Sequence, residues 1–286
     1  MQRSGALGQD SLPSEWFSLV PLYSGGAGVP IFMVHWLERD LAQYLAVDRP
    51  VYGLSLGFAG GDISDETLLP NSIRDIATHY IEEMRTLQPN GPYQLIGHSA
   101  GGLLAYEMAL QILAVGQEVS LLGLLDTSVP QRGSDRVLLP IHLQLANVLK
   151  TPLSLIWHVT KKKIRQQLNR MSSGDRNSVQ ALRTSAAHRL MFIERALDDY
   201  EPVPCPGQIH LFKSIGEARF IRALPPPPIE LAWANLAKGG VVVHELPGDH
   251  MAIVKKPLAK VTAAAILACL QPPLPARREN GDLRGP

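Results

Sequence analysis

The chain has 286 residues, of which 45% are hydrophobic and 19% are charged, and its formal net charge at pH 7 is +1. The apolar fraction is large enough to build a sizeable core, which argues against global disorder. A net charge this close to zero gives no indication of nucleic acid or anionic membrane surfaces as partners. The length fits either two small domains or one large α/β domain.

The ends of the chain and its cysteines bear on organisation and location. Residues 1–14 are mostly small and polar, without the apolar segment of a signal peptide, and residues 271–286 combine prolines with mixed charges. We expect both ends to be flexible, around one domain spanning 15–270. Cys205 and Cys269 lie far apart and lack metal-ligand spacing, so we expect no disulfide framework, no metal site and a reducing, cytoplasmic compartment.

Short apolar strands alternate with helices along most of the chain. The predicted strands are 31–35, 51–54, 93–96, 119–125, 208–212 and 241–246. The predicted helices are 39–45, 71–87, 102–114, 229–238 and 256–270. Strands that are apolar on both faces and alternate with helices are typical of an α/β fold, with a mostly parallel central sheet and helices on both faces.

The alternation breaks over residues 127–206, where the sequence predicts several helical segments and no strand. We expect this insertion to form a helical lid over the site, because it begins directly after a candidate catalytic residue. The alternative is a helical subdomain that only adds stability. The longest apolar stretch, 137–159, is interrupted by prolines and polar side chains, so we expect no membrane span.

Residues 97–101 read Gly-His-Ser-Ala-Gly, a G-x-S-x-G motif centred on Ser99. The motif lies between the predicted strand 93–96 and the predicted helix 102–114, and a nucleophile elbow requires this strand–turn–helix context. A side chain two positions before or after the serine would collide in so tight a turn, which explains both glycines. We interpret Ser99 as a nucleophile; the alternative is an incidental serine in a glycine-rich turn.

A serine hydroxyl needs a base within hydrogen-bond reach and a group that orients the base. On sheets that carry this elbow, the chain order is serine, then acid, then histidine. His250 lies in the loop after the last predicted strand, and Asp126 directly follows strand 119–125. Asp249 is the rival acid, but it adjoins the histidine and is better suited to shape its turn.

These sequence features resemble the type I thioesterase domains of non-ribosomal peptide synthetases and polyketide synthases, which belong to the α/β-hydrolase superfamily. The resemblance extends from about residue 19 to residue 270. It is carried by five linked segments: Val34-His35, 48–54, 97–102, 125–127 and 246–250. It implies an α/β-hydrolase fold with a helical lid.

The resemblance also implies a reaction. Such domains take an acyl, peptidyl or polyketide chain from the phosphopantetheine of a carrier protein, hold it as a serine ester and release it. The implied triad is Ser99 as nucleophile, His250 as base and Asp126 as the acid that orients it. The implied partner is an acyl or peptidyl carrier protein, and no cofactor is implied beyond the phosphopantetheine that carries the substrate.

The resemblance places one oxyanion-hole donor at the backbone N–H of Ala100, the residue after the nucleophile. For the second donor the sequence departs from its relatives, which typically continue Val-His with proline, a small residue and two glycines. Here Val34-His35 is followed by Trp36 and Leu37, so we expect one of their N–H groups to serve. Loss of one donor would lower the rate about a hundredfold or more.

Two other functions remain open from the sequence. One is a general carboxylesterase or lipase that acts on free esters. The other is a binding protein that keeps the fold without a competent oxyanion hole. A basic segment over 150–174 fits the acidic face of a carrier protein or the phosphate of pantetheine, with a solvated helix face as the alternative.

Overall fold

The computed structural model describes residues 17–35, 37–56, 70, 72–130, 196–197, 199–216 and 229–270. Four predicted features lie outside these residues: the flexible ends, Trp36, the basic segment and most of the lid over 127–206.

A seven-stranded sheet with the order β1-β3-β2-β4-β5-β6-β7 forms the centre of the fold. Its strands are β1 (Leu19–Tyr23), β2 (Ile31–Val34), β3 (Val51–Leu54), β4 (Tyr93–His98), β5 (Val119–Leu125), β6 (Ile209–Ser214) and β7 (Val241–Leu246). All neighbouring strands are parallel except β1, which pairs antiparallel with β3 at one edge. The prediction of an α/β fold with a mostly parallel sheet is confirmed.

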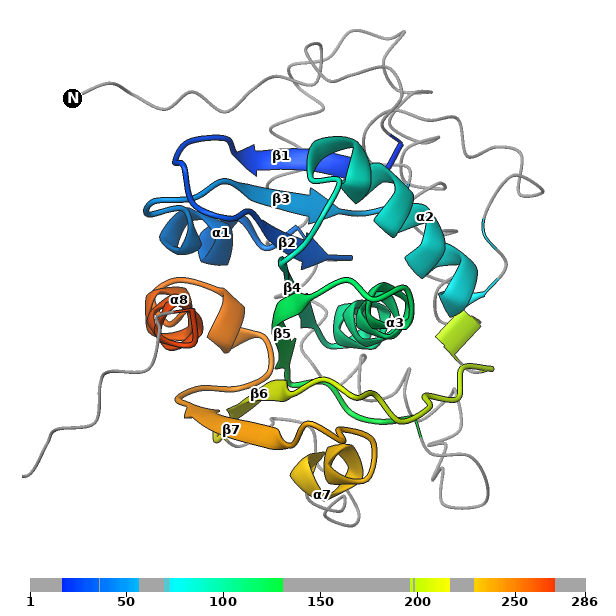
Figure 1. Ribbon diagram of the computed structural model, residues 1–286. Helices are drawn as coiled ribbons and strands as arrows, with labels where there is room; N and C mark the ends of the chain where they lie inside the picture. The colour runs from blue at the N-terminus through cyan, green and yellow to red at the C-terminus, as the bar shows by residue number, and fades with distance from the viewer. Residues whose placement is uncertain are drawn as a thin grey trace, which may run out of the picture.

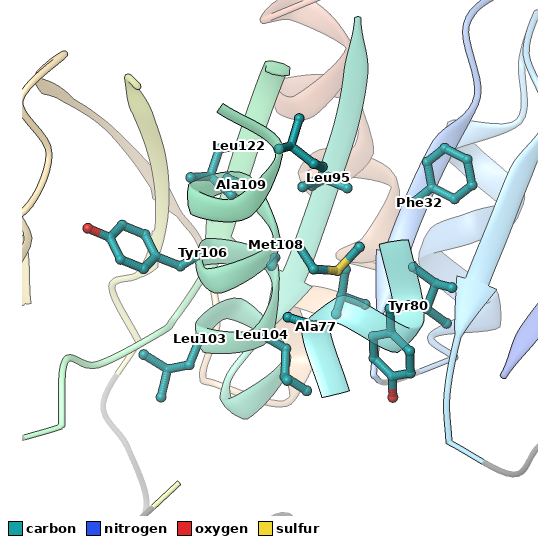
Figure 2. Close-up of a cluster of buried hydrophobic side chains, with 14 of the residues drawn as sticks. Phe32, Ala77, Tyr80, Leu95, Leu103, Leu104, Tyr106, Met108, Ala109 and Leu122 are labelled. Atoms are coloured by element: carbon teal, nitrogen blue, oxygen red, sulfur yellow. The ribbon is translucent and has the colours of Figure 1, made fainter. Parts of the chain in front are cut away.

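Helices cover both faces of the sheet (Figure 1). They are α1 (Arg39–Leu45), α2 (Ile73–Leu87), α3 (Ala100–Ala114), α7 (Ile229–Ala234) and α8 (Ala259–Ala268), with a 3-10 turn at Ala252–Val254. One core cluster joins the sheet to α2, α3 and α7, and a second joins its other face to α1 and α8. Figure 2 shows the first cluster, where Ala77 of α2 and Met108 of α3 gather with Leu95 of β4 and Leu122 of β5.

The central helix and strand are buried nearly throughout, as their apolar sequences predict. Every residue of β4 is buried, since α3 covers one face of the sheet here and the second core cluster the other. Helix α2 is amphipathic instead, and it begins at a cap in which Ser72 Oγ accepts a hydrogen bond from the Asp75 N–H at 3.1 Å. Among the described residues, no helix combines the length and the apolar character needed to cross a bilayer.

Several elements begin or end up to three residues from their predicted bounds, and two differ by more. Strand β1 was not expected, since Pro21 interrupts its apolar pattern; proline is tolerated there because β1 is an edge strand. Helix α7 ends at Ala234 rather than at residue 238, because the backbone beyond it bonds elsewhere. The Cys205 N–H donates to Leu236 O at 2.7 Å, and the Lys238 N–H donates to Cys205 O at 2.8 Å.

Candidate active site

Ser99 directly follows β4 and caps the N-terminus of α3, with φ 55° and ψ −123°. A non-glycine residue in such a conformation costs about 1–3 kcal/mol, so the surrounding turn must hold it in place. A Cβ at Gly97 would collide with the carbonyl oxygen of Gly101, and a Cβ at Gly101 would collide with that of Val34. The two glycines of the motif therefore allow β4, β2 and α3 to meet around the serine.

Strain of this kind recurs along one edge of the sheet. Within the described ranges, the non-glycine residues with positive φ are His35 (74°), Ser99 (55°) and Asp126 (43°). Each directly follows the carboxyl end of a strand, namely β2, β4 and β5, and these three strands are neighbours. Strained residues cluster at functional sites, and the carboxyl ends of parallel strands are where such sites assemble.

Asp126 and His250 are in contact although 124 residues separate them, with 3.3 Å between Asp126 Oδ2 and His250 Nδ1. The other carboxylate oxygen, Oδ1, accepts a hydrogen bond from the Ser214 N–H at 2.7 Å. Burial alone would raise the pKa of Asp126, but the hydrogen bonds from His250 and Ser214 hold this pKa below its ordinary value. Asp126 is therefore ionised at neutral pH and fixed at both oxygens.

The rival acid, Asp249, has a different environment. Its Oδ1 accepts hydrogen bonds from the N–H groups of Met251 and Ala252, at 3.1 and 2.9 Å. These bonds shape the turn that leads into the 3-10 segment. The structure thus assigns the contact with the His250 ring to Asp126.

His98, the variable residue of the motif, lies against His250. The two ring centroids are 4.5 Å apart, and His98 Nε2 donates a hydrogen bond to the His250 backbone carbonyl at 2.9 Å. On the other side of its ring, His98 Nδ1 lies 3.8 Å from Oε1 of the buried Glu38, which also pairs with Lys255. We call His98, Glu38 and Lys255 the His98 network. Sequence reasoning missed it, because no local pattern links positions 38, 98 and 255.

The His250 side chain is 41% exposed, and its ring borders the residue that precedes Ser99. Among the described residues, the Ser99 hydroxyl forms no hydrogen bond with this ring. Catalytic hydrogen bonds of this type often tighten only when substrate is bound.

Of the three predicted oxyanion-hole donors, Ala100 and Leu37 belong to the described residues. Ala100 is the first residue of α3, where backbone N–H groups lack intrahelical partners and favour negative charge. The Leu37 side chain packs against Gly53 of β3, where a Cβ would collide with it. Trp36 lies outside the described residues, so the second donor stays a prediction. Burial lowers the pKa of the adjacent His35 to about 4, which makes its imidazole neutral at pH 7.

Relatives of this chain are large synthetases. One is a probable non-canonical nonribosomal peptide synthetase, CymA, from Salinispora arenicola, which is 38% identical over 137 residues, 46% of this chain and 2% of the synthetase. Another is chondramide synthase cmdD from Chondromyces crocatus, 26% identical over 268 residues, 84% of this chain and 6% of the synthase. The chain thus spans a small part of either relative.

Similar solved structures include the NocB thioesterase domain in covalent complex with a fluorophosphonate nocardicin G analog. It is 24% identical with a TM-score of 0.58, and the match covers 89% of this chain and 100% of that one. At this identity the likeness speaks for the fold, which is that of the α/β hydrolases. Residues 33–266 match the family model described as a thioesterase domain. The chain therefore belongs to the thioesterase domain family.

Proposed function

We propose that this chain is a serine thioesterase that releases an acyl, peptidyl or polyketide chain from the phosphopantetheine of a carrier protein. Its family and fold support a hydrolase that acts on thioesters in general. The relatives support the finer assignment, since the names of two of them describe a nonribosomal peptide synthetase and a chondramide synthase. The proposal requires no cofactor bound to this chain, because phosphopantetheine arrives with the partner.

One observation carries the serine mechanism. The contact between Asp126 Oδ2 and His250 Nδ1 lies at the edge of the sheet where Ser99 is held in a strained turn. An acid that accepts from Nδ1 leaves the opposite ring nitrogen, Nε2, free to take a proton. The chain order of the three residues is the one that this fold uses.

In the proposed first step, Ser99 Oγ attacks the thioester carbonyl while His250 takes the hydroxyl proton. Asp126 stabilises the imidazolium that forms, and the Ala100 N–H donates to the oxyanion. The C–S bond then breaks, the imidazolium gives its proton to the departing sulfur or to solvent, and the acyl group remains as an ester on Ser99. In the second step, the neutral His250 takes a proton from water or from a nucleophile within the acyl chain as it attacks the ester carbonyl. His250 then returns a proton to Ser99 Oγ as the ester C–O bond breaks.

The test of the nucleophile is covalent labelling. The purified chain is incubated with a fluorophosphonate probe and with a panel of acyl-pantetheine thioesters, and its mass is measured intact and after digestion. We expect one adduct per chain, on Ser99, and none in Ser99→Ala. An unmodified chain, despite cooperative thermal unfolding, would contradict the mechanism and favour a binding protein that keeps the fold.

Substrate preference distinguishes the proposed thioesterase from a general esterase. Rates are compared for an acyl-pantetheine thioester and for an aryl ester of the same acyl group. We expect the thioester to have the higher kcat/KM. A clear preference for the free ester would assign the same serine chemistry to a carboxylesterase or lipase.

A further inference from the structure

A second group of side chains gathers near the far edge of the sheet. His210 belongs to β6, His244 belongs to β7, and Cys269 follows the last residue of α8. His210 Nδ1 lies 3.1 Å from His244 Nε2, and His244 Nε2 lies 3.6 Å from Cys269 Sγ. The three ligand atoms all lie within 4.8 Å of one another.

The pairing of the strands explains this arrangement. His210 lies opposite Val242 and Phe212 lies opposite His244, so both histidines project from the sheet face that α8 covers. The Phe212 ring stacks on His244 with centroids 4.6 Å apart and an interplanar angle of 16°. This stacking restrains the central imidazole, as supporting groups do around metal ligands.

Two of the three separations are close to those of a tetrahedral metal centre. With Zn–N bonds of about 2.0–2.1 Å and a Zn–S bond of about 2.3 Å, tetrahedral geometry separates two nitrogens by about 3.4 Å and nitrogen from sulfur by about 3.6 Å. We propose that His210, His244 and Cys269 bind one borderline divalent transition-metal ion, such as Zn²⁺, with its fourth position open to water. Two imidazoles and one thiolate suit such an ion better than Mg²⁺ or Ca²⁺.

Metal binding requires both imidazoles to be neutral and the thiol to lose its proton. On binding, the S–H proton passes to solvent, and each imidazole places its remaining proton on the nitrogen that faces away from the ion.

The proposed centre is separate from the catalytic edge. On β6, His210 lies four residues before Ser214, whose N–H binds Asp126, a separation of about 13 Å along a strand. A bound ion would clamp the end of α8 to β6 and β7. Its expected effect is therefore on stability, and its test does not depend on the thioesterase proposal.

Cobalt titration of the tag-free chain tests the site directly. We expect one Co²⁺ per chain, with the near-ultraviolet thiolate-to-cobalt absorption and the intense visible bands of tetrahedral Co²⁺. Zn²⁺ should bleach both signals and raise the Tm. Cys269→Ser should abolish the thiolate band, and His244→Asn should weaken Co²⁺ binding tenfold or more.

Two matched variants control for the chemistry of the substitutions. Cys205→Ala removes the other cysteine and His79→Asn removes a histidine on α2, and both should keep the cobalt spectrum of the parent. If the parent shows no thiolate band, or if the band survives in Cys269→Ser, the three residues are a hydrogen-bonded cluster and the proposal is wrong. Circular dichroism of each variant confirms that a lost signal does not reflect unfolding.

Discussion

At the scale of single residues, Asp126 and Asp249 show how two identical side chains differ in their hydrogen-bond partners. Both belong to loops at the carboxyl edge of the sheet, and both accept two hydrogen bonds. Asp126 divides its oxygens between the His250 ring and the Ser214 N–H, whereas Asp249 uses one oxygen for two backbone N–H groups of its own turn. In the proposed mechanism the Asp126 carboxylate orients the base, whereas the Asp249 carboxylate stabilises a loop.

This division predicts unequal effects of the same substitution. Asp126→Asn should lower kcat/KM for an acyl thioester about 10³- to 10⁴-fold, because an amide can hold the imidazole in the wrong tautomer. Asp249→Asn should cost about 1 kcal/mol of stability through weakened turn hydrogen bonds and change kcat/KM by less than about tenfold. Steady-state kinetics at pH 7 with both variants checks this, and similar losses in the two would contradict the assignment of Asp126.

At the scale of elements, Glu83 attaches the edge strand β1 to helix α2. Its carboxylate accepts hydrogen bonds from the N–H groups of Phe17, Ser18 and Leu19, at distances of 2.6 to 3.1 Å. Burial alone would raise the pKa of Glu83, but a hydrogen bond from His79 and those from the backbone hold the pKa below its ordinary value. The ionised form is therefore the one that the folded state stabilises.

The lowered pKa of Glu83 predicts an acid-dependent contribution to stability. Because the folded pKa lies below that of the unfolded chain, the contribution is complete above the ordinary value of about 4.3 and is lost as pH falls through the folded value. Glu83→Gln should therefore reduce the free energy of unfolding by about 1–3 kcal/mol at pH 7. The difference from the parent should shrink as the pH falls below about 4.

Urea unfolding at several pH values measures this effect. The matched control is Glu82→Gln, which changes the exposed neighbour of Glu83 on the same helix and should leave stability nearly unchanged. A difference between Glu83→Gln and the parent that stayed constant on acidification would show that the carboxylate charge does not anchor β1.

At the scale of the whole molecule, the sequence predicts most of the layered fold, because strand and helix periodicities are local signals. The structure has β3, β5, β7 and α1 at their predicted bounds. Strand β1 was not predicted, because Pro21 interrupts the apolar pattern of this edge strand. Helix α7 was predicted too long, because its end depends on hydrogen bonds to Cys205, which is distant in sequence. Tertiary contacts override local pattern in both cases.

The sites, like the fold, include contacts that the sequence predicts and contacts that depend on tertiary packing. The meeting of Asp126 with His250 could be predicted, because parallel strands bring their carboxyl ends to one edge and both residues follow strands. The His98 network and the group of His210, His244 and Cys269 could not, since each joins side chains whose positions depend on strand register and helix packing. The spacing of these residues along the sequence does not predict such contacts.

The position of Glu38 couples two parts of the proposed machinery. Glu38 directly follows Trp36 and Leu37, from which the second oxyanion donor is expected. Its carboxylate lies near His98, whose ring packs against His250, and pairs with Lys255. A change in the length of the segment after β2 would therefore disturb the placement of the general base together with the pocket for the developing negative charge. A substitution that alters the oxyanion pocket should therefore also alter the position of the base. Replacing the segment after β2 with a glycine-rich segment from a relative would require compensating substitutions around residue 255.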